Sequence, residues 1–269
     1  MNHIPEKKRD VIRDALGGYA DKVALSVLDT VDSTNTLAKA FAHEKTPALY
    51  IARTQTGGRG RLGRSFHSPA DTGLYMTVAY TTDEPLTQAV RVTALASVAA
   101  VSAIEALTGK SPAIKWVNDI YLDGCKIGGI LTEAVTLPEG STRMIVGLGI
   151  NLTTTAFPEG LRAPASCLFP PGEAHIATSD LADRLAGEIT RRLLAAVDGS
   201  IPPAACLQAY RAHLCYVGET VLCTRGSEAF EGVVLGVDEG YSLLVSVDGQ
   251  TMTISSGEIS IRPRSNPYI

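Results

Sequence analysis

A cluster of glycine and arginine residues offers the clearest chemistry in the sequence. This arginine loop runs Gln55-Thr-Gly-Gly-Arg-Gly-Arg-Leu-Gly-Arg-Ser-Phe66, and no acidic residue occurs between Glu44 and Asp71 in a chain of formal net charge −4. Arginine supplies a fixed fork of donors for phosphate or carboxylate, and glycine lets backbone N–H groups approach a ligand closely. We therefore predict a flexible loop that wraps an anionic small molecule.

Two nucleotide-binding motifs overlap with the arginine loop. Gly58-x-Gly60-x-x-Gly63 matches the dinucleotide fingerprint, and residues 58–65 nearly match the P-loop, with Arg64 in place of lysine. Both motifs need a helix directly after the loop, because the helix N-terminus holds the phosphate. Residues 65–73 instead have the composition of turns. We exclude both motifs, and a purely solvated basic loop remains the alternative.

Polar residues are also grouped in an apolar segment and at a junction between a predicted strand and helix. Residues 113–134 are rich in Ile, Val, Tyr and Leu, yet contain Lys115, Asn118, Asp119 and Lys126. Burying such charges is costly unless they pair or bind a ligand; the alternative is that Lys115 and Asp119 lie on a solvent-facing side. Residues 32–35 (Asp-Ser-Thr-Asn) offer more hydrogen-bonding groups than a helix cap uses, so we expect one to cap a helix and others to contact a ligand.

These groups fit activation of a carboxylate or phosphoryl transfer. Hydrolysis by acid–base catalysis would require paired carboxylates, and covalent catalysis would require a nucleophile beside a base. Neither arrangement is visible in the sequence, and the five histidines are scattered singly.

The order of the helices and strands expected around these residues predicts an α+β fold. We expect helices over 5–16, 36–42, 86–107, 180–197 and 202–214, and strands over 23–31, 48–53, 73–80 and 143–150. Asp123-Gly124 predicts a tight hairpin within 113–134, and 153–177 reads as a proline-rich loop. From Gly218 onward, short strands and turns at 225–226, 238–240 and 248–249 predict a small β-barrel or sandwich.

The bulk composition is that of an ordinary globular protein of 269 residues, with 45% hydrophobic and 19% charged side chains. The pI near 5.8 argues against a general nucleic-acid binder. No stretch of eighteen apolar residues and no signal peptide are apparent, so we expect no membrane association and a cytoplasmic location. The five cysteines include no Cys-x-x-Cys pair, so we expect reduced thiols and assign no metal site.

Five motifs, in order, resemble the biotin protein ligases. They are Asp32-Ser-Thr-Asn35, the arginine loop, Lys115-Trp-Val-Asn-Asp119, Lys126-Ile-Gly-Gly-Ile-Leu-Thr-Glu133 and Gly147-Leu-Gly-Ile-Asn151, and the tail Gly257-Glu-Ile-Ser-Ile261 is also similar. The family pattern usually has proline at Val117 and often alanine at Gly57, but neither change removes a functional group.

The resemblance implies a catalytic domain over residues 1–217, related to class II aminoacyl-tRNA synthetases, with a mixed or antiparallel sheet and flanking helices. An SH3-like barrel over 218–269 would follow. The implied reaction joins biotin and ATP, with Mg²⁺, into biotinoyl-5′-AMP and transfers biotin to a lysine of a biotin carboxyl carrier protein or domain. The resemblance implies a monomer or a homodimer.

The resemblance also implies roles for individual residues. Arg61, Lys126 and Asp119 would be catalytic. Biotin would be bound by Ser33, Thr34, Asn35, Gln55, Gly58, Arg59, Gly60, Arg61 and Lys126. The nucleotide would be bound by Arg61, Arg64, Trp116, Asn118, Asp119 and Asn151.

Two alternative functions differ in their ligands. A lipoate or octanoate ligase is disfavoured by the full arginine loop and the C-terminal barrel. A biotin-dependent transcriptional repressor would need a helix-turn-helix, and residues 1–22 provide for one helix at best, so we expect no DNA binding.

Overall fold

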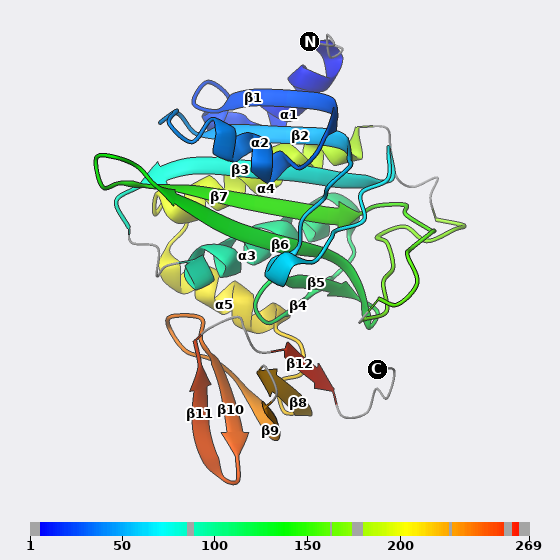
Figure 1. Cartoon of the computed structure of the whole chain (residues 1–269), viewed down its shortest axis with the longest axis vertical. Helices are drawn as coiled ribbons and strands as arrows, with labels where there is room; N and C mark the ends of the chain where they lie inside the picture. Colours follow the sequence, from blue (N-terminus) through cyan, green and yellow to red (C-terminus); the bar gives the residue numbers. More distant parts are fainter. Residues whose placement is uncertain are drawn as a thin grey trace.

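The computed structural model describes residues 6–84, 89–161, 163–173, 180–225, 228–255 and 260–263. Seven strands form the larger of its two sheets (Figure 1): β1 (Ala24–Val31), β2 (Ala48–Gln55), β3 (Gly73–Thr82), β4 (Ala113–Lys115), β5 (Asp119–Leu122), β6 (Cys125–Thr136) and β7 (Thr142–Asn151). Their order is β1-β2-β3-β7-β6-β5-β4. β1 and β2 are parallel and the remaining neighbours antiparallel, which confirms the predicted mixed sheet.

Helices cover both faces of this sheet. One face carries α1 (Glu6–Leu16), α3 (Ala89–Thr108), α4 (Leu181–Val197) and α5 (Pro203–His213), and the other carries the short α2 (Thr34–Ala40) (Figure 1). Strand side chains alternate between the two faces, so Leu49 and Ile51 join the large core while Ala48 and Tyr50 pack in the small core under α2. The predicted α+β class is therefore confirmed.

The helix α3 is the central element of the large core. By length and composition it could cross a membrane, but 67% of its apolar window is buried inside the protein, as in a core helix. The sequence predicted this helix over 86–107, and residues 86–88 lie outside the described part of the chain.

A smaller antiparallel sheet follows α5. It contains β8 (Thr220–Arg225), β9 (Glu228–Val237), β10 (Leu243–Val247), β11 (Gln250–Ile254) and β12 (Ser260–Pro263), in the order β11-β10-β9-β8-β12. The predicted short strands after residue 218 are thus confirmed. Parts of the predicted 153–177 loop, the 225–226 turn and the Gly257 motif lie outside the described residues.

The two predicted Asp-Gly turns have the backbone that such turns require. Asp123 and Gly124 have φ of +49° and +76° and join β5 to β6, and Asp248 and Gly249 have φ of +50° and +79° and join β10 to β11. Positive φ at both central residues twists the chain to suit two antiparallel strands. The first turn places Lys126 beside Tyr121 in the register of β5 and β6.

Candidate active site

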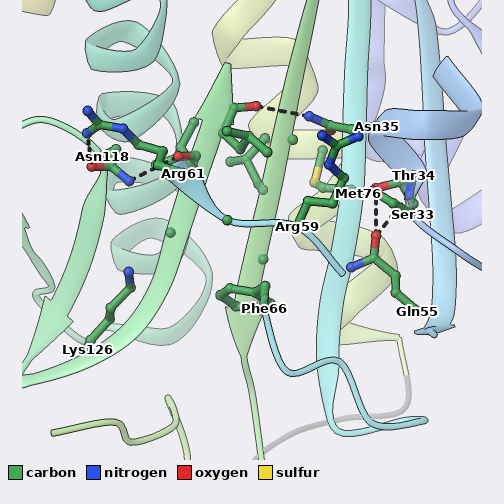
Figure 2. Close-up of a pocket in the computed structure, with 17 residues that line it drawn as sticks. Ser33, Thr34, Asn35, Gln55, Arg59, Arg61, Phe66, Met76, Asn118 and Lys126 are labelled. Atoms are coloured by element: carbon green, nitrogen blue, oxygen red, sulfur yellow. Dashed lines mark hydrogen bonds between the residues drawn. The ribbon is translucent and has the colours of Figure 1, made fainter. Parts of the chain in front are cut away.

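A cavity opens on the α2 face of the large sheet, beside the N-terminal end of α2 (Figure 2). Lys126, Asn118 and Arg61 lie on one side of it and the Ser33–Asn35 segment with Gln55 on the other, with Arg59 and Phe66 between them. The predicted residues in its lining are Ser33, Thr34, Asn35, Gln55, Arg59, Gly60, Arg61, Asn118 and Lys126.

Two glycines of β7 create the space for this cavity. Thr77 of β3 and Leu131 of β6 flank Gly147, and Tyr75 and Gly129 flank Gly149 in the next row. A Cβ on Gly147 would collide with the Asn35 amide, lying 2.9 Å from its Cγ, and one on Gly149 would collide with the Phe66 ring. The face of β7, the middle strand, is therefore covered by side chains from α2 and from the arginine loop.

A chain of hydrogen bonds forms one wall of the cavity. Gln55 Oε1 accepts from the Thr34 backbone N–H at 2.9 Å, and its Nε2 donates to Ser68 Oγ at 3.0 Å. The Thr77 hydroxyl lies 2.8 Å from Thr34 Oγ1 and donates to Asn35 Oδ1 at 2.6 Å. These polar side chains are held by one another, so they present fixed hydrogen-bonding groups to a ligand.

The predicted capping of α2 by its own polar residues is wrong. Ser33 occupies the N-cap position, but its side chain makes no capping hydrogen bond. Gln55, which lies far away in sequence, accepts from the first helical N–H instead. Ser33 is thereby left to face the cavity, where it is 98% buried within the protein.

The arginine loop forms a closed hairpin over the cavity. The Gly60 N–H donates to Arg64 O at 2.7 Å, and the Phe66 N–H donates to Gly58 O at 2.8 Å. A single 3₁₀ turn spans Arg61–Gly63, and the backbone from Arg64 to Thr72 is not helical. This confirms that neither the dinucleotide fingerprint nor the P-loop applies.

The tip of the loop reaches Asn118, which lies directly before β5 and next to the polar residues of β5 and β6. Arg61 Nη1 donates to Asn118 Oδ1 at 2.7 Å, and Asn118 Nδ2 donates to Asp119 Oδ1 at 3.1 Å. Lys126 Nζ makes a 2.5 Å ion pair with the same Asp119 oxygen. The three residues predicted to be catalytic, Arg61, Asp119 and Lys126, are thus joined in one cluster by Asn118.

A second cavity adjoins the first and shares Phe66 and Lys126 with it. Its lining contains the predicted residues Arg64, Asp119 and Asn151, together with Lys115. The segment after β7 closes it with residues that no sequence pattern indicated, namely Phe157, Gly160, Leu161, Ala163 and Ala165. Lys126 therefore lies at the boundary between the two cavities, where a ligand in one would meet a ligand in the other.

Two of the predicted site residues do not line either cavity. Trp116 is buried in the core, and its Nε1 donates to the backbone carbonyl of Tyr241, just before β10, at 2.8 Å. Gly58 lies in the closely packed base of the arginine loop, where a Cβ would collide with Phe66 O and lie 2.7 Å from Ser68 Oγ. Neither residue faces the space of the two cavities.

Glu133 of β6 contacts residues of the site, and sequence reasoning assigned it no role. It accepts from Asn35 Nδ2 at 2.9 Å and from Lys39 Nζ at 2.6 Å, and Arg59 Nη2 lies 4.0 Å away. Burial alone would raise the pKa of its carboxyl, but the hydrogen bonds from Lys39 and Asn35, with the charges of Lys39 and Arg59, outweigh burial and lower it. Glu133 is therefore ionised at neutral pH.

Comparison with known proteins identifies relatives along most of the chain. A model of the Biotin/lipoate A/B protein ligase family matches residues 27–151. A bifunctional ligase/repressor BirA from Bacillus spizizenii is 30% identical over 237 residues, covering 87% of this chain and 72% of that protein. A biotin–[acetyl-CoA-carboxylase] ligase from Mycobacterium tuberculosis is 27% identical over 263 residues, with 95% of each chain covered.

A solved structure has the same fold. The biotin protein ligase from Aquifex aeolicus in complex with biotin and ATP is 26% identical, with a TM-score of 0.72 over 89% of this chain and 99% of that one.

Proposed function

The chain belongs to the biotin/lipoate A/B protein ligase family, and from this we propose that it is an ATP-dependent biotin protein ligase. It activates biotin to biotinoyl-5′-AMP and transfers the biotinoyl group to a lysine of a biotin carboxyl carrier domain. The observation that carries this proposal is the pair of cavities that meet at Lys126 under the arginine loop. One cavity takes biotin and the other takes the nucleotide.

The first step needs a carboxylate to approach a phosphate of the same charge sign. An oxygen of the biotin carboxylate attacks the α-phosphorus of ATP, and the bond to pyrophosphate breaks. Lys126, in both cavities, binds that carboxylate once it exchanges Asp119 for the ligand, and Arg61 neutralises charge that develops on the α-phosphate. Arg64 and Asn151 bind the nucleotide in the second cavity.

The second step transfers the activated group. The neutral amine of the carrier lysine attacks the biotinoyl carbonyl carbon, AMP leaves with the electrons of the broken C–O bond, and the amine loses a proton. Asp119 lines the second cavity close to Lys126 and provides a carboxylate that can hold that proton. The arginine loop excludes water from the reactive anhydride between the steps.

Biotin brings a cyclic urea that suits the polar end of the first cavity. We assign contacts with this ring to Ser33, Thr34, Asn35 and Gln55, while Arg59 and Gly60 cover the ligand from above. Lipoate carries a dithiolane in place of the urea and has no N–H groups to offer these side chains.

Mg²⁺ fits this site as a companion of ATP. It is commonly held by one or two carboxylates, by water and by substrate phosphates. Asp119 offers a carboxylate in the second cavity, and within the described residues no group of three or more His, Cys, Asp or Glu side chains could hold a metal by itself. When bound with the nucleotide, Mg²⁺ supplies neutralisation of phosphate charge.

We further propose the division into a class II synthetase-like catalytic domain, residues 1–217, and an SH3-like barrel, residues 218–269. The separate antiparallel sheet after α5 supports this division. We propose a cytoplasmic location, in keeping with five free cysteines.

A direct test measures exchange of labelled pyrophosphate into ATP with biotin, with lipoate and with neither. We expect exchange with biotin alone. Exchange that depends on lipoate, or none with either acid, would refute the proposed substrate. Biotin transfer to a carboxyl carrier domain, with ATP omitted as the control, tests the second step.

A further inference from the structure

Glu133 occupies an unusual position next to the biotin cavity. It does not line the cavity, and its side chain is 20% exposed. Its contacts with Asn35 and Lys39 connect β6 to α2. An ionised carboxylate accepts hydrogen bonds and donates none. Whatever faces Glu133 must therefore be a donor.

This requirement fixes the orientation of the Asn35 amide. Asn35 Nδ2 donates to Glu133 Oε2 and, at 3.2 Å, to Leu131 O, so both of its hydrogens point to acceptors. Asn35 Oδ1 must then face Thr77, 2.6 Å away. Gly147 allows this close packing, since a Cβ there would lie 3.0 Å from Asn35 Nδ2 and closer still to Oδ1.

The orientation passes from Asn35 to the threonines. Thr77 has one hydroxyl hydrogen and gives it to Asn35 Oδ1, which leaves only lone pairs for its 2.8 Å contact with Thr34. The Thr34 hydroxyl hydrogen then points either to Thr77 or to Gln55 Oε1, 3.2 Å away, and both are acceptors. Towards the cavity, Asn35 Oδ1 and Thr34 Oγ1 can offer only lone pairs.

We propose that Glu133 is the positioning residue that makes this wall of the cavity hydrogen-bond accepting, and that it thereby selects a ligand head group with N–H donors. The inference rests on the proposed function, whose substrate carries two N–H groups on its urea ring. Lys39 keeps Glu133 charged. A neutral residue at this position, able to donate, would leave Leu131 O as the remaining acceptor that opposes a turn of the Asn35 amide, so the amide could turn over and present N–H groups to the ligand.

The test compares two ligands by calorimetry on the full chain. One is biotin, and the other is its cyclic carbonate analogue, in which oxygen atoms replace both ring N–H groups. A site built around hydrogen bonds rejects a ligand that lacks the matching group strongly. We expect the wild type to prefer biotin at least about 100-fold, and Glu133→Gln to reduce that preference at least about tenfold, with the KM for ATP unchanged.

A matched control is Glu139→Gln. Glu139 pairs with Lys45 at 2.8 Å on an exposed part of the chain, so the same substitution breaks an ion pair away from the cavity. It should leave the preference unchanged. Thr77→Val provides a second variant, because it removes the hydroxyl that receives its orientation from Asn35, and it should lower the preference in the same way.

An equal loss of affinity for both ligands in Glu133→Gln would show a merely structural role and overturn the inference, as would an unchanged preference in both variants. If the wild type itself shows no biotin-dependent exchange of pyrophosphate into ATP, the proposed function fails as well. Wild-type exchange with unaltered preference in Glu133→Gln refutes the inference alone.

Discussion

Arg61 and Asn118 join the tip of the arginine loop to the turn between β4 and β5 through a hydrogen bond of 2.7 Å from Nη1 to Oδ1. The Asn118 side chain is itself held in place, because its Nδ2 donates to Ile130 O and to Asp119 Oδ1, each at 3.1 Å. The loop is thus fastened over the cavity by a side chain that is itself oriented from two directions.

We expect Arg61→Gly to leave adenylation possible, although slower, and to release the adenylate. The substitution removes the link to Asn118 and adds backbone freedom, so the loop closes less well over the reactive anhydride. Biotinoyl-AMP in the medium should rise at least about tenfold over the wild type, as expected for loss of a charge-assisted hydrogen bond. Leu62→Gly is the control in the same loop, since Leu62 is 67% exposed. Release equal to that of the wild type would contradict the role of a lid.

Gly149→Ala should close the cavity from below. Its new Cβ would overlap the Phe66 ring, with Cζ at 2.6 Å, and Phe66 lines both cavities. We expect the KM for biotin and the KM for ATP to rise together. The fold should be retained, which circular dichroism measures. Gly18→Ala is the control, because a Cβ there meets nothing within 4 Å. A normal KM for both substrates would show that Phe66 moves aside without cost.

Lys126→Gln should weaken biotin-dependent pyrophosphate exchange. It removes the cation shared by both cavities and leaves Asp119 without its 2.5 Å partner. A hydrogen bond to a charged group contributes about 1.5–3 kcal/mol, so kcat/KM should fall roughly 10- to 100-fold. Lys110→Gln breaks the ion pair with Glu173, also short at 2.6 Å, and serves as the control. Equal activity of the two variants would exclude Lys126 from carboxylate binding.

Trp116→Phe should destabilise the protein without removing a ligand contact. The buried carbonyl of Tyr241 would lose its 2.8 Å indole donor, which costs about 1–3 kcal/mol in the free energy of unfolding. Urea unfolding measures this loss. Tyr19→Phe removes an exposed 2.6 Å hydrogen bond to Asp198 and should change the unfolding free energy much less. A large rise in the KM for ATP at unchanged stability would instead support the predicted contact between Trp116 and the nucleotide.

Glu133 should contribute a pH-dependent part of the stability. The pKa of its carboxyl is lower in the folded protein than its ordinary value of 4.5, so folding is favoured when the group is ionised. This stabilisation is complete above pH 4.5 and is lost as the pH falls through the lowered pKa. Unfolding free energies of the wild type and Glu133→Gln, measured from pH 7 down to pH 3, should therefore converge. A constant difference over this range would contradict the lowered pKa.

Local patterns in the sequence predicted much of the fold. The Asp123-Gly124 turn, the apolar helix α3 and the alternating strands follow from preferences of neighbouring residues, and the structure confirms them. The arginine loop could also be recognised, because its composition is unusual over a short stretch.

Features that depend on contacts between distant residues could not be predicted. Gln55 satisfies the first N–H of α2 across 21 positions, and Asn35 meets Glu133 across 98. Trp116 stands within a motif of site residues, yet it faces Tyr241 in the core. Phe157 and Leu161 reach the second cavity from an irregular segment without periodicity that would indicate their direction.

The glycines at 147 and 149 have a consequence for how this protein could diversify. They lie on a strand that is hydrogen-bonded on both sides, so the depth of the cavity is set by the sheet itself. Changes of length or charge at the tip of the loop, away from Phe66, leave these two glycines in place. Substitutions at Gly147 or Gly149, with compensating changes at Asn35 or Phe66, are therefore the first choice for a variant that accepts a bulkier or smaller acid. Selectivity for ligand size and control over ligand release are thus separable traits in this architecture.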